Sequence, residues 1–142
     1  MKYSEEFAKV CDPMKLTVRQ LMKQAVVTCN PRARAMDLAR RLSEWNVGSI
    51  PIVEDDHTLV GLVSESDLID MLIAGRDLRM LTVADVMTRK VVTVTEDMSA
   101  LDLMNLFQDR YLIRVPVVKD NILVGVVARR DVILGYVKVL EG

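Results

Sequence analysis

The chain of 142 residues is 51% hydrophobic and 27% charged, so it can bury a hydrophobic core and is neither disordered nor fibrous. Nineteen Lys and Arg against 20 Asp and Glu give a formal net charge of -1, which excludes the strong positive field that collects nucleic acids. This length fits one compact domain, or two half-size units that share a core, and is too short for a multidomain enzyme.

The sequence predicts a cytoplasmic protein. No apolar run approaches the roughly 18 residues of a membrane span, and the first residues lack the layout of a signal peptide. Cys11 and Cys29 are too few and too far apart for a disulfide framework, which fits a reducing compartment. His57, the only histidine, lies beside the acidic run 54–56 in a polar turn. We therefore expect neither a metal site nor a histidine-based catalytic site.

Residues 1–16 precede any repeated pattern and are expected to form an N-terminal extension. Within it, Tyr3, Phe7 and Val10 are three or four positions apart. Apolar residues at that spacing share one face of a helix. We therefore predict an added helix here that docks on the body of the protein.

The rest of the chain is an internal repeat, with 17–75 matched by 82–142 and a linker at 76–81. Two short runs recur, IPIV of 50–53 as VPVV at 115–118, and LVGLV of 59–63 as LVGVV at 123–127. The first pair is shifted by 65 positions and the second by 64, so the second repeat has one residue fewer in the turn between these runs. A repeat of this length indicates that one structural unit occurs twice.

Each repeat predicts a short helix, an extended stretch, a second helix, two strands and a closing helix. Thr17 with Gln20, and Thr82 with Asp85, have the spacing of a capping box, which predicts the short first helix. The apolar stripes of the second helices are Ala35, Leu38, Leu42 and Trp45, and Ala100, Leu103, Met104 and Phe107. The β-rich runs predict two hairpins, 50–53 with 59–63 and 115–118 with 123–127, followed by helices that begin near Ser66 and Arg130.

We therefore expect an α/β fold in which a βαββα unit occurs twice. A unit of about 60 residues buries little of its surface when it folds alone. The two units should therefore share an interface and be related by a pseudo-twofold axis.

The signatures h-P-h-V and L-V-G-h-V-x-x-x-D, where h is apolar, resemble those of the cystathionine-β-synthase (CBS) domain. Because they occur twice in register, residues 17–140 resemble a tandem CBS pair, also called a Bateman module. The resemblance implies two small α/β units packed through their sheets. It also implies clefts between them that bind adenosine-type ligands such as AMP, ADP, ATP or S-adenosylmethionine. Such pairs sense a ligand, with no required cofactor and no catalytic residues.

The resemblance implies a ribose-binding aspartate in each repeat. Residues 61–67 match the family pattern G-h-h-[ST]-x-x-D, in which Ser64 lies near the phosphate and Asp67 accepts hydrogen bonds from the ribose hydroxyls. A carboxylate suits a diol because it is purely an acceptor when ionised. Ser64 and Asp67 also have the spacing of a helix cap, and both interpretations stay open. The second repeat keeps Asp131 but has Ala128 in place of the hydroxyl, which argues against phosphate recognition there.

Two arginines extend the implied site. By the same resemblance, Arg114 and Arg130 point toward the phosphate of the nucleotide whose ribose Asp67 holds, while their counterparts Ser49 and Ser66 carry no charge. We therefore expect the Asp67 cleft to bind phosphate and the Asp131 cleft to be weaker. The adenine contacts implied are Val63, Thr95, Ala100 and Leu112 in the first cleft, and Asn30, Ala35, Val47 and Val127 in the second.

The sequence thus predicts a regulatory CBS-pair protein that binds an adenine nucleotide or adenosine derivative and is not an enzyme. One alternative is a ligand-independent dimerisation scaffold. The last helix is apolar on nearly every side, so we expect a homodimer in either case. The other alternative is nucleic-acid binding, because four arginines crowd one helix region, Arg32, Arg34, Arg40 and Arg41. Nearby Asp37 and Glu44 dilute that charge and make this function unlikely on electrostatic grounds.

Overall fold

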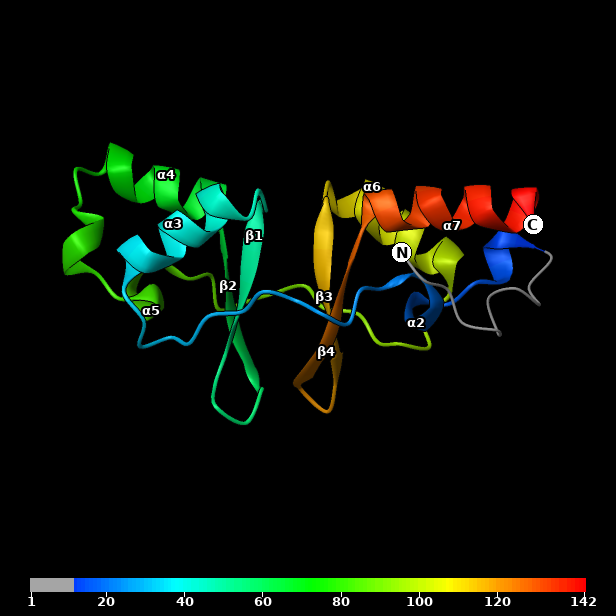
Figure 1. Cartoon of the computed structure of the whole chain (residues 1–142), viewed down its shortest axis with the longest axis horizontal. Coiled ribbons are helices and arrows are strands. Elements are labelled where there is room, and N and C mark those ends of the chain that lie inside the picture. Colours follow the sequence, from blue (N-terminus) through cyan, green and yellow to red (C-terminus); the bar gives the residue numbers. More distant parts are fainter. Residues whose placement is uncertain (1–11) are drawn as a thin grey trace. The chain divides into compact units, whose positions relative to one another are not determined.

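The computed structural model describes residues 12–142, which divide into two compact units (Figure 1). Unit 1 contains the described residues up to Val26 together with Val92–Asp120 and Val124–Gly142. Unit 2 contains Val27–Val91 and Asn121–Leu123. The helix expected at Tyr3, Phe7 and Val10 lies outside the described residues.

Unit 2 holds most of the first repeat. Its elements are α3 (Ala35–Glu44), β1 (Ser49–Val53), β2 (Leu59–Ser64), α4 (Glu65–Ile73), the 3-10 turn η2 (Leu78–Met80) and α5 (Val83–Val86). β1 and β2 form an antiparallel hairpin in which Ser49 pairs with Ser64 and Ile50 pairs with Val63. Apolar residues from both helices and strands form the core of this unit, including Leu38, Leu42, Ile50, Ile52, Val63 and Leu68.

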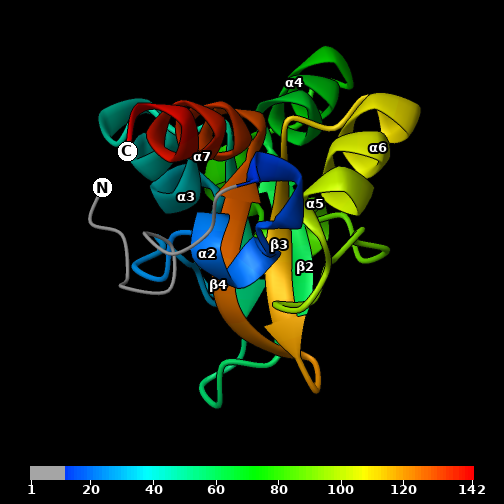
Figure 2. The ribbon, with the colours of Figure 1, turned by 90° about the vertical axis from the view of Figure 1, so that its right-hand side faces the viewer.

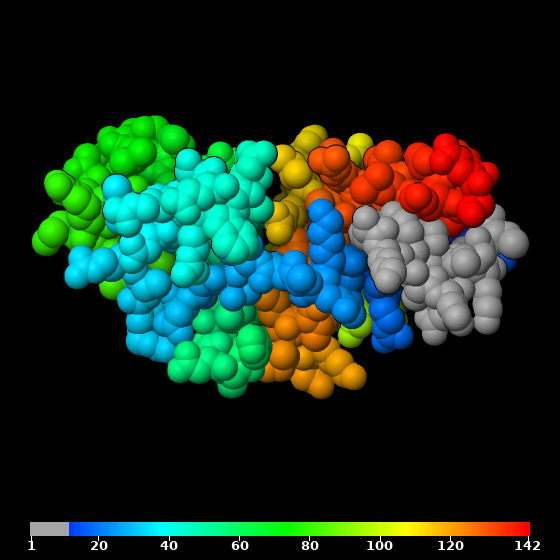
Figure 3. Space-filling view, viewed as in Figure 1, coloured from blue at the N-terminus to red at the C-terminus, as the bar shows by residue number. Residues whose placement is uncertain are grey.

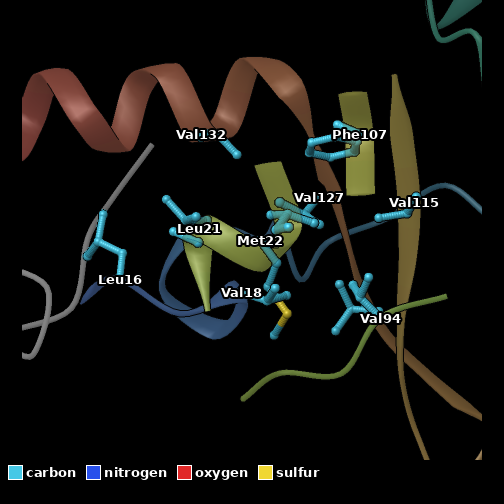
Figure 4. Packing of buried hydrophobic residues seen from close by; sticks show 12 residues of the cluster. Leu16, Val18, Leu21, Met22, Val94, Phe107, Val115, Val127 and Val132 are labelled. Atoms are coloured by element: carbon cyan, nitrogen blue, oxygen red, sulfur yellow. The ribbon is translucent and has the colours of Figure 1, made fainter. Parts of the chain in front are cut away.

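Unit 1 holds most of the second repeat. Its elements are the 3-10 turn η1 (Pro13–Lys15), α2 (Val18–Leu21), α6 (Ala100–Arg110), β3 (Arg114–Lys119), most of β4 (Ile122–Ala128) and α7 (Arg129–Glu141). β3 and β4 form a two-stranded sheet. Figure 4 shows the core of the unit, where Val132 of α7 extends toward Leu21 and Val127. The expected order of helices and strands is therefore confirmed in both repeats.

The first helix of each repeat belongs to the unit that contains the rest of the other repeat. α2 packs in unit 1, where Val18 and Leu21 are fully buried and the helix contacts α7 (Figure 2). α5 packs in unit 2, where Val83 and Val86 are part of the core. Equivalent backbone hydrogen bonds hold the two helices, from Val18 N–H to the Met98 carbonyl at 2.9 Å and from Val83 N–H to the Ala33 carbonyl at 2.8 Å.

The short first helices begin as the sequence predicts. Gln20 Oε1 accepts a hydrogen bond from the Thr17 backbone N–H at 2.9 Å, and Asp85 Oδ2 accepts one from the Thr82 N–H at 2.8 Å. These bonds satisfy backbone donors that a helix start leaves free. Both capping boxes are therefore confirmed.

The extended stretches before the second helices are shorter than a regular strand. Cys29 forms a single parallel bridge with Ile52, and Val94 forms the equivalent bridge with Val117. The hairpin turns also differ, because β3 and β4 are joined by Asp120 and Asn121 alone, with φ of 49° and 66°. Two residues with positive φ are typical of a tight hairpin turn, which Asp and Asn tolerate well.

Among residues 12–142, no helix is long and apolar enough to cross a membrane. The longest helix, α7, has 13 residues. Several of its large apolar side chains are exposed, namely Ile133, Leu134, Tyr136, Val137 and Leu140. Figure 3 shows the open surface of α7 in orange to red.

Candidate functional site

The two candidate aspartates lie where the last strand of each hairpin meets the next helix. β2 ends at Ser64 and α4 begins at Glu65, whereas β4 ends at Ala128 and α7 begins at Arg129. Asp67 and Asp131 are each the third residue of their helix. A carboxylate at this position can accept the N–H of the residue before the helix, and the helix dipole favours its charge.

Both oxygens of Asp67 are bonded within unit 2. Oδ2 accepts the Ser64 backbone N–H at 2.8 Å and the Ser64 hydroxyl at 3.0 Å. Oδ1 accepts the hydroxyl of Thr88 at 3.0 Å. The Ser64 hydroxyl in turn accepts the Asp67 N–H at 3.2 Å. The helix-cap interpretation is therefore confirmed, and a ligand hydroxyl at Oδ1 would share that oxygen with Thr88.

Asp131 differs from Asp67 in its burial and in its hydrogen bonds. It is only 2% exposed and is the only buried charged or polar residue in the described part of the chain. Oδ2 accepts the Ala128 backbone N–H at 2.8 Å, but Oδ1 has no hydrogen-bond partner. A buried acceptor without a donor costs about 1–3 kcal/mol. Asp131 therefore offers an acceptor that a donor on a ligand would satisfy.

Two cations lie near this carboxylate. The Lys23 ammonium is 3.9 Å from Oδ1 of Asp131, beyond hydrogen-bond distance, and the lysine side chain is 58% exposed. Arg114, at the start of β3, is half-buried. Burial lowers the pKa of Arg114, and the negative charge of Asp131 opposes that shift. The neighbourhood of Asp131 therefore carries two positive charges against one negative charge.

Glycines explain how distant segments reach the aspartates. Lys23 and Val126 form an antiparallel bridge with two backbone hydrogen bonds of 2.9 Å. A Cβ on Gly125 would lie 2.7 Å from the Lys23 carbonyl oxygen, closer than a carbon atom approaches an oxygen without a clash. Leu62 and Thr88 form the equivalent bridge in unit 2. The glycine of the LVG run therefore allows the close backbone approach that brings Lys23 to Asp131.

Sequence reasoning missed Lys23 and Thr88. Both follow the short first helix of a repeat, and they are 65 positions apart, so the repeat makes them equivalent. This equivalence, combined with the glycine in each LVG run, could have identified Lys23 and Thr88. It did not do so because neither residue lies near an aspartate in the sequence.

The predicted phosphate-binding residues belong to different units. Ser64 lies in unit 2 with Asp67, whereas Arg114 and Arg130 lie in unit 1. Arg130 is exposed near the start of α7. A nucleotide that contacts Asp67 together with the two arginines therefore stays a prediction.

The predicted adenine contacts divide into two groups. Four side chains are buried in the unit cores, namely Val63, Ala100, Ala35 and Val127. The other four retain exposed surface, namely Thr95, Leu112, Asn30 and Val47. Thr95 donates its hydroxyl to Asp97 at 2.6 Å, and the Asn30 side-chain amide donates to Asp55 at 3.1 Å.

The arginines that suggested nucleic-acid binding are largely engaged within unit 2. Arg32 pairs with Glu54 at 2.9 Å and with Asp55 at 3.6 Å. Arg40 pairs with Asp37 at 3.0 Å. The described residues contain no group of three or more His, Cys, Asp and Glu side chains that could hold a metal ion. The two aspartates therefore remain the candidates for a ligand contact.

The two strand–helix junctions and the 65-residue repeat point to one family. The family model described as "CBS domain" matches twice, at residues 18–74 and 83–138. The chain belongs to the CBS domain family. It contains a pair of CBS domains, with the mixed helix and strand content expected from the sequence.

Curated relatives resemble the chain over most of its length. The uncharacterized protein YlbB of Bacillus subtilis is 34% identical over 118 residues, which cover 82% of this chain and 80% of YlbB. The chain spans only 61% of another curated relative, the uncharacterized protein MK0525 of Methanopyrus kandleri.

Two solved CBS structures contain adenosyl ligands. CBSX2 in complex with AMP has a TM-score of 0.79 and 27% identity, covering 88% of this chain and 98% of CBSX2. The CBS domain pair of MJ0100, in complex with 5′-methylthioadenosine and S-adenosyl-L-methionine, has a TM-score of 0.73 and 26% identity, covering 83% and 93% of the two chains.

Proposed function

We propose that this CBS pair is a regulatory protein that binds an adenine nucleotide or another adenosyl compound. The observation that carries the proposal is the buried Asp131 carboxylate, whose Oδ1 has no hydrogen-bond partner at the β4–α7 junction. The AMP complex of CBSX2 and the S-adenosylmethionine complex of MJ0100 support an adenosyl ligand.

Ribose fits the chemistry of Asp131. The 2′ and 3′ hydroxyls are two donors on one face of the sugar, and an ionised carboxylate accepts hydrogen bonds without donating any. Oδ1 of Asp131 would gain the donor that it lacks, in an environment where a charge-assisted hydrogen bond is strong. Ribose binding therefore removes an energetic cost that the ligand-free protein carries.

Asp67 is proposed as a second ribose contact. Its Oδ1 already accepts the Thr88 hydroxyl, so a ligand hydroxyl there would add a second bond to a satisfied acceptor and would gain less. The sequence expectation of a phosphate bound by Ser64, Arg114 and Arg130 is part of the same proposal. The relative strengths of the two aspartates are measurable with single-site variants.

We also propose that the protein acts as a homodimer. α7 exposes Ile133 and Leu140 to 64% and 60%, which is unusual for large apolar side chains on one helix. A second copy that covers this face would remove apolar surface from water. A ligand can regulate such an assembly only through different affinities for its alternative arrangements.

A thermal-shift panel tests ligand binding. AMP, ADP, ATP, adenosine and S-adenosylmethionine are added to the protein, with GMP as a control for the base. At least one adenine compound should raise Tm in proportion to the logarithm of its concentration above Kd, because it binds only the folded state. If no adenine compound raises Tm and sedimentation still detects a dimer, the scaffold alternative replaces the sensor.

A further inference from the structure

Lys23 distinguishes the surroundings of the two aspartates. Its ammonium lies 3.9 Å from Oδ1 of Asp131. The residue 65 positions later, Thr88, is instead a neutral donor to Oδ1 of Asp67. The backbone geometry is equivalent, since both residues lie in an antiparallel bridge beside a glycine of an LVG run. The charge of the side chain is therefore the difference that matters for a ligand.

We infer that Lys23 is a specificity-determining residue, which makes the Asp131 end of unit 1 prefer an adenosyl ligand that carries a phosphate over the uncharged nucleoside. The inference rests on the proposed function, because it assigns a ligand class to the same carboxylate. It goes beyond that function in naming a residue that selects the charge of the ligand.

The position of Lys23 suits such a role. Because 3.9 Å is too long for a hydrogen bond, the ammonium balances the charge of Asp131 without occupying Oδ1. Its side chain is 58% exposed, so its flexible four-carbon stem is free to turn toward a phosphate on the same sugar. A ribose hydroxyl would then bond Oδ1 while the ammonium moves toward the 5′ substituent.

Charge around Asp131 favours an anion. Arg114 is half-buried in the same unit, and the negative charge of Asp131 acts on it. Together with Lys23, it gives two cations for one carboxylate. No lysine or arginine within the described residues forms an ion pair with Asp67. Lys23 therefore supplies beside Asp131 a cation for which Asp67 has no ion-paired counterpart, and its charge favours an anionic ligand there.

The test compares AMP with adenosine by isothermal titration calorimetry at low salt. Lys23→Met removes the charge, adds no hydroxyl that could bond Oδ1 of Asp131 as Thr88 bonds Oδ1 of Asp67, and leaves the backbone bridge to Val126 intact. Lys23→Arg keeps the charge. Lys119→Met is the matched control, because it removes one exposed lysine from unit 1, roughly 16 Å along β3 from Arg114.

Lys23→Met should weaken AMP binding about tenfold and leave adenosine binding nearly unchanged. Lys23→Arg and Lys119→Met should keep the wild-type preference for AMP. Equal losses for AMP and adenosine in Lys23→Met would mean that Lys23 only positions Asp131, and unchanged affinities would mean that it plays no part. Both results overturn the inference while the proposed function stands. If wild type binds neither compound nor any other adenosyl ligand, the proposed function fails first.

Discussion

Lys23 and Asp131 form an ion pair at 3.9 Å in which the aspartate Oδ1 receives no hydrogen bond. The equivalent pair in the other repeat, Thr88 and Asp67, is a hydrogen bond of 3.0 Å. One repeated backbone arrangement thus produces two carboxylates with different properties. The first is a buried acceptor beside a cation, and the second is a helix cap whose oxygens are both bonded.

The helix caps predict a pair of opposite stability changes. Ser64→Ala removes the hydroxyl that accepts the Asp67 N–H, so it should lower the free energy of unfolding by about 1 kcal/mol. Ala128→Ser should raise it by a similar amount. Ala128 has the extended backbone of a cap residue, with φ −117° and ψ 162°, but no hydroxyl. Urea denaturation of both variants measures the effect, and a loss of stability in Ala128→Ser would contradict this account of the junction.

Gly125→Ala should destabilise unit 1. The new Cβ would lie 2.7 Å from the Lys23 carbonyl oxygen, a backbone atom that cannot turn away. We expect a loss of about 1–3 kcal/mol, typical of overpacking. Gly48→Ala is the matched control, because its nearest atom would be the Glu65 carboxylate at 3.4 Å. Thermal denaturation compares the two, and equal Tm values would show that Gly125 is not needed for close approach.

Cys29 should be a slow nucleophile in the folded protein. Burial raises the pKa of its thiol above the usual range, although Arg41, whose guanidinium donates to Sγ at 3.1 Å, lowers it in part. Because the folded pKa lies above the unfolded value, this group stabilises the fold at neutral pH. That contribution is lost as the pH rises through the range in which the thiol ionises.

Iodoacetamide labelling measures this reactivity. The variant Cys11→Ser leaves Cys29 as the only thiol, and at about pH 8 it should react far more slowly when native than in urea, since the thiolate is the reactive form. Arg41→Met should slow the native reaction further. Equal native and unfolded rates would contradict the burial of this thiol.

The exposed face of α7 predicts self-association. Ile133→Glu places a charge on an apolar surface that is 64% exposed, so it should disrupt a dimer without disturbing the core. Sedimentation velocity over a range of concentrations should give a dimer for wild type and a monomer for Ile133→Glu. Leu101→Glu, at an exposed position of α6, is the control that should stay dimeric. A monomeric wild type at all concentrations would contradict the proposed homodimer.

Much of the fold could be predicted from the sequence because its signals are local. The capping residues Thr17 and Thr82, the apolar stripes and the hairpin runs each lie within one short segment, and the repeat provides a second copy of each. The membership of α2 and α5 in the opposite units was not predicted. Their contacts join residues 80 positions apart in Val18 and Met98 and 50 positions apart in Val83 and Ala33, and no local pattern encodes them.

The candidate site could be predicted only in part. The motifs located Asp67 and Asp131 at the helix starts. The apolar character of a residue, however, does not show whether it is buried, as Val63 is, or partly exposed, as Leu112 is. The hydrogen-bond state of each carboxylate depends on Thr88 and Lys23, which approach from distant parts of the chain. The preference for the Asp67 cleft stays a prediction, while the unpaired Oδ1 favours Asp131 as the stronger ribose contact.

Calorimetric titration of adenosyl ligands into Asp131→Asn tests the central claim most directly. The amide keeps the size of the side chain and an oxygen for the Ala128 N–H, but its nitrogen cannot accept a ribose hydroxyl. We predict saturable binding of AMP to wild type and to the control Asp70→Asn, an exposed aspartate of α4, with a loss of more than about tenfold in Asp131→Asn. Undiminished AMP affinity in Asp131→Asn would contradict the assignment of this carboxylate as the ribose acceptor.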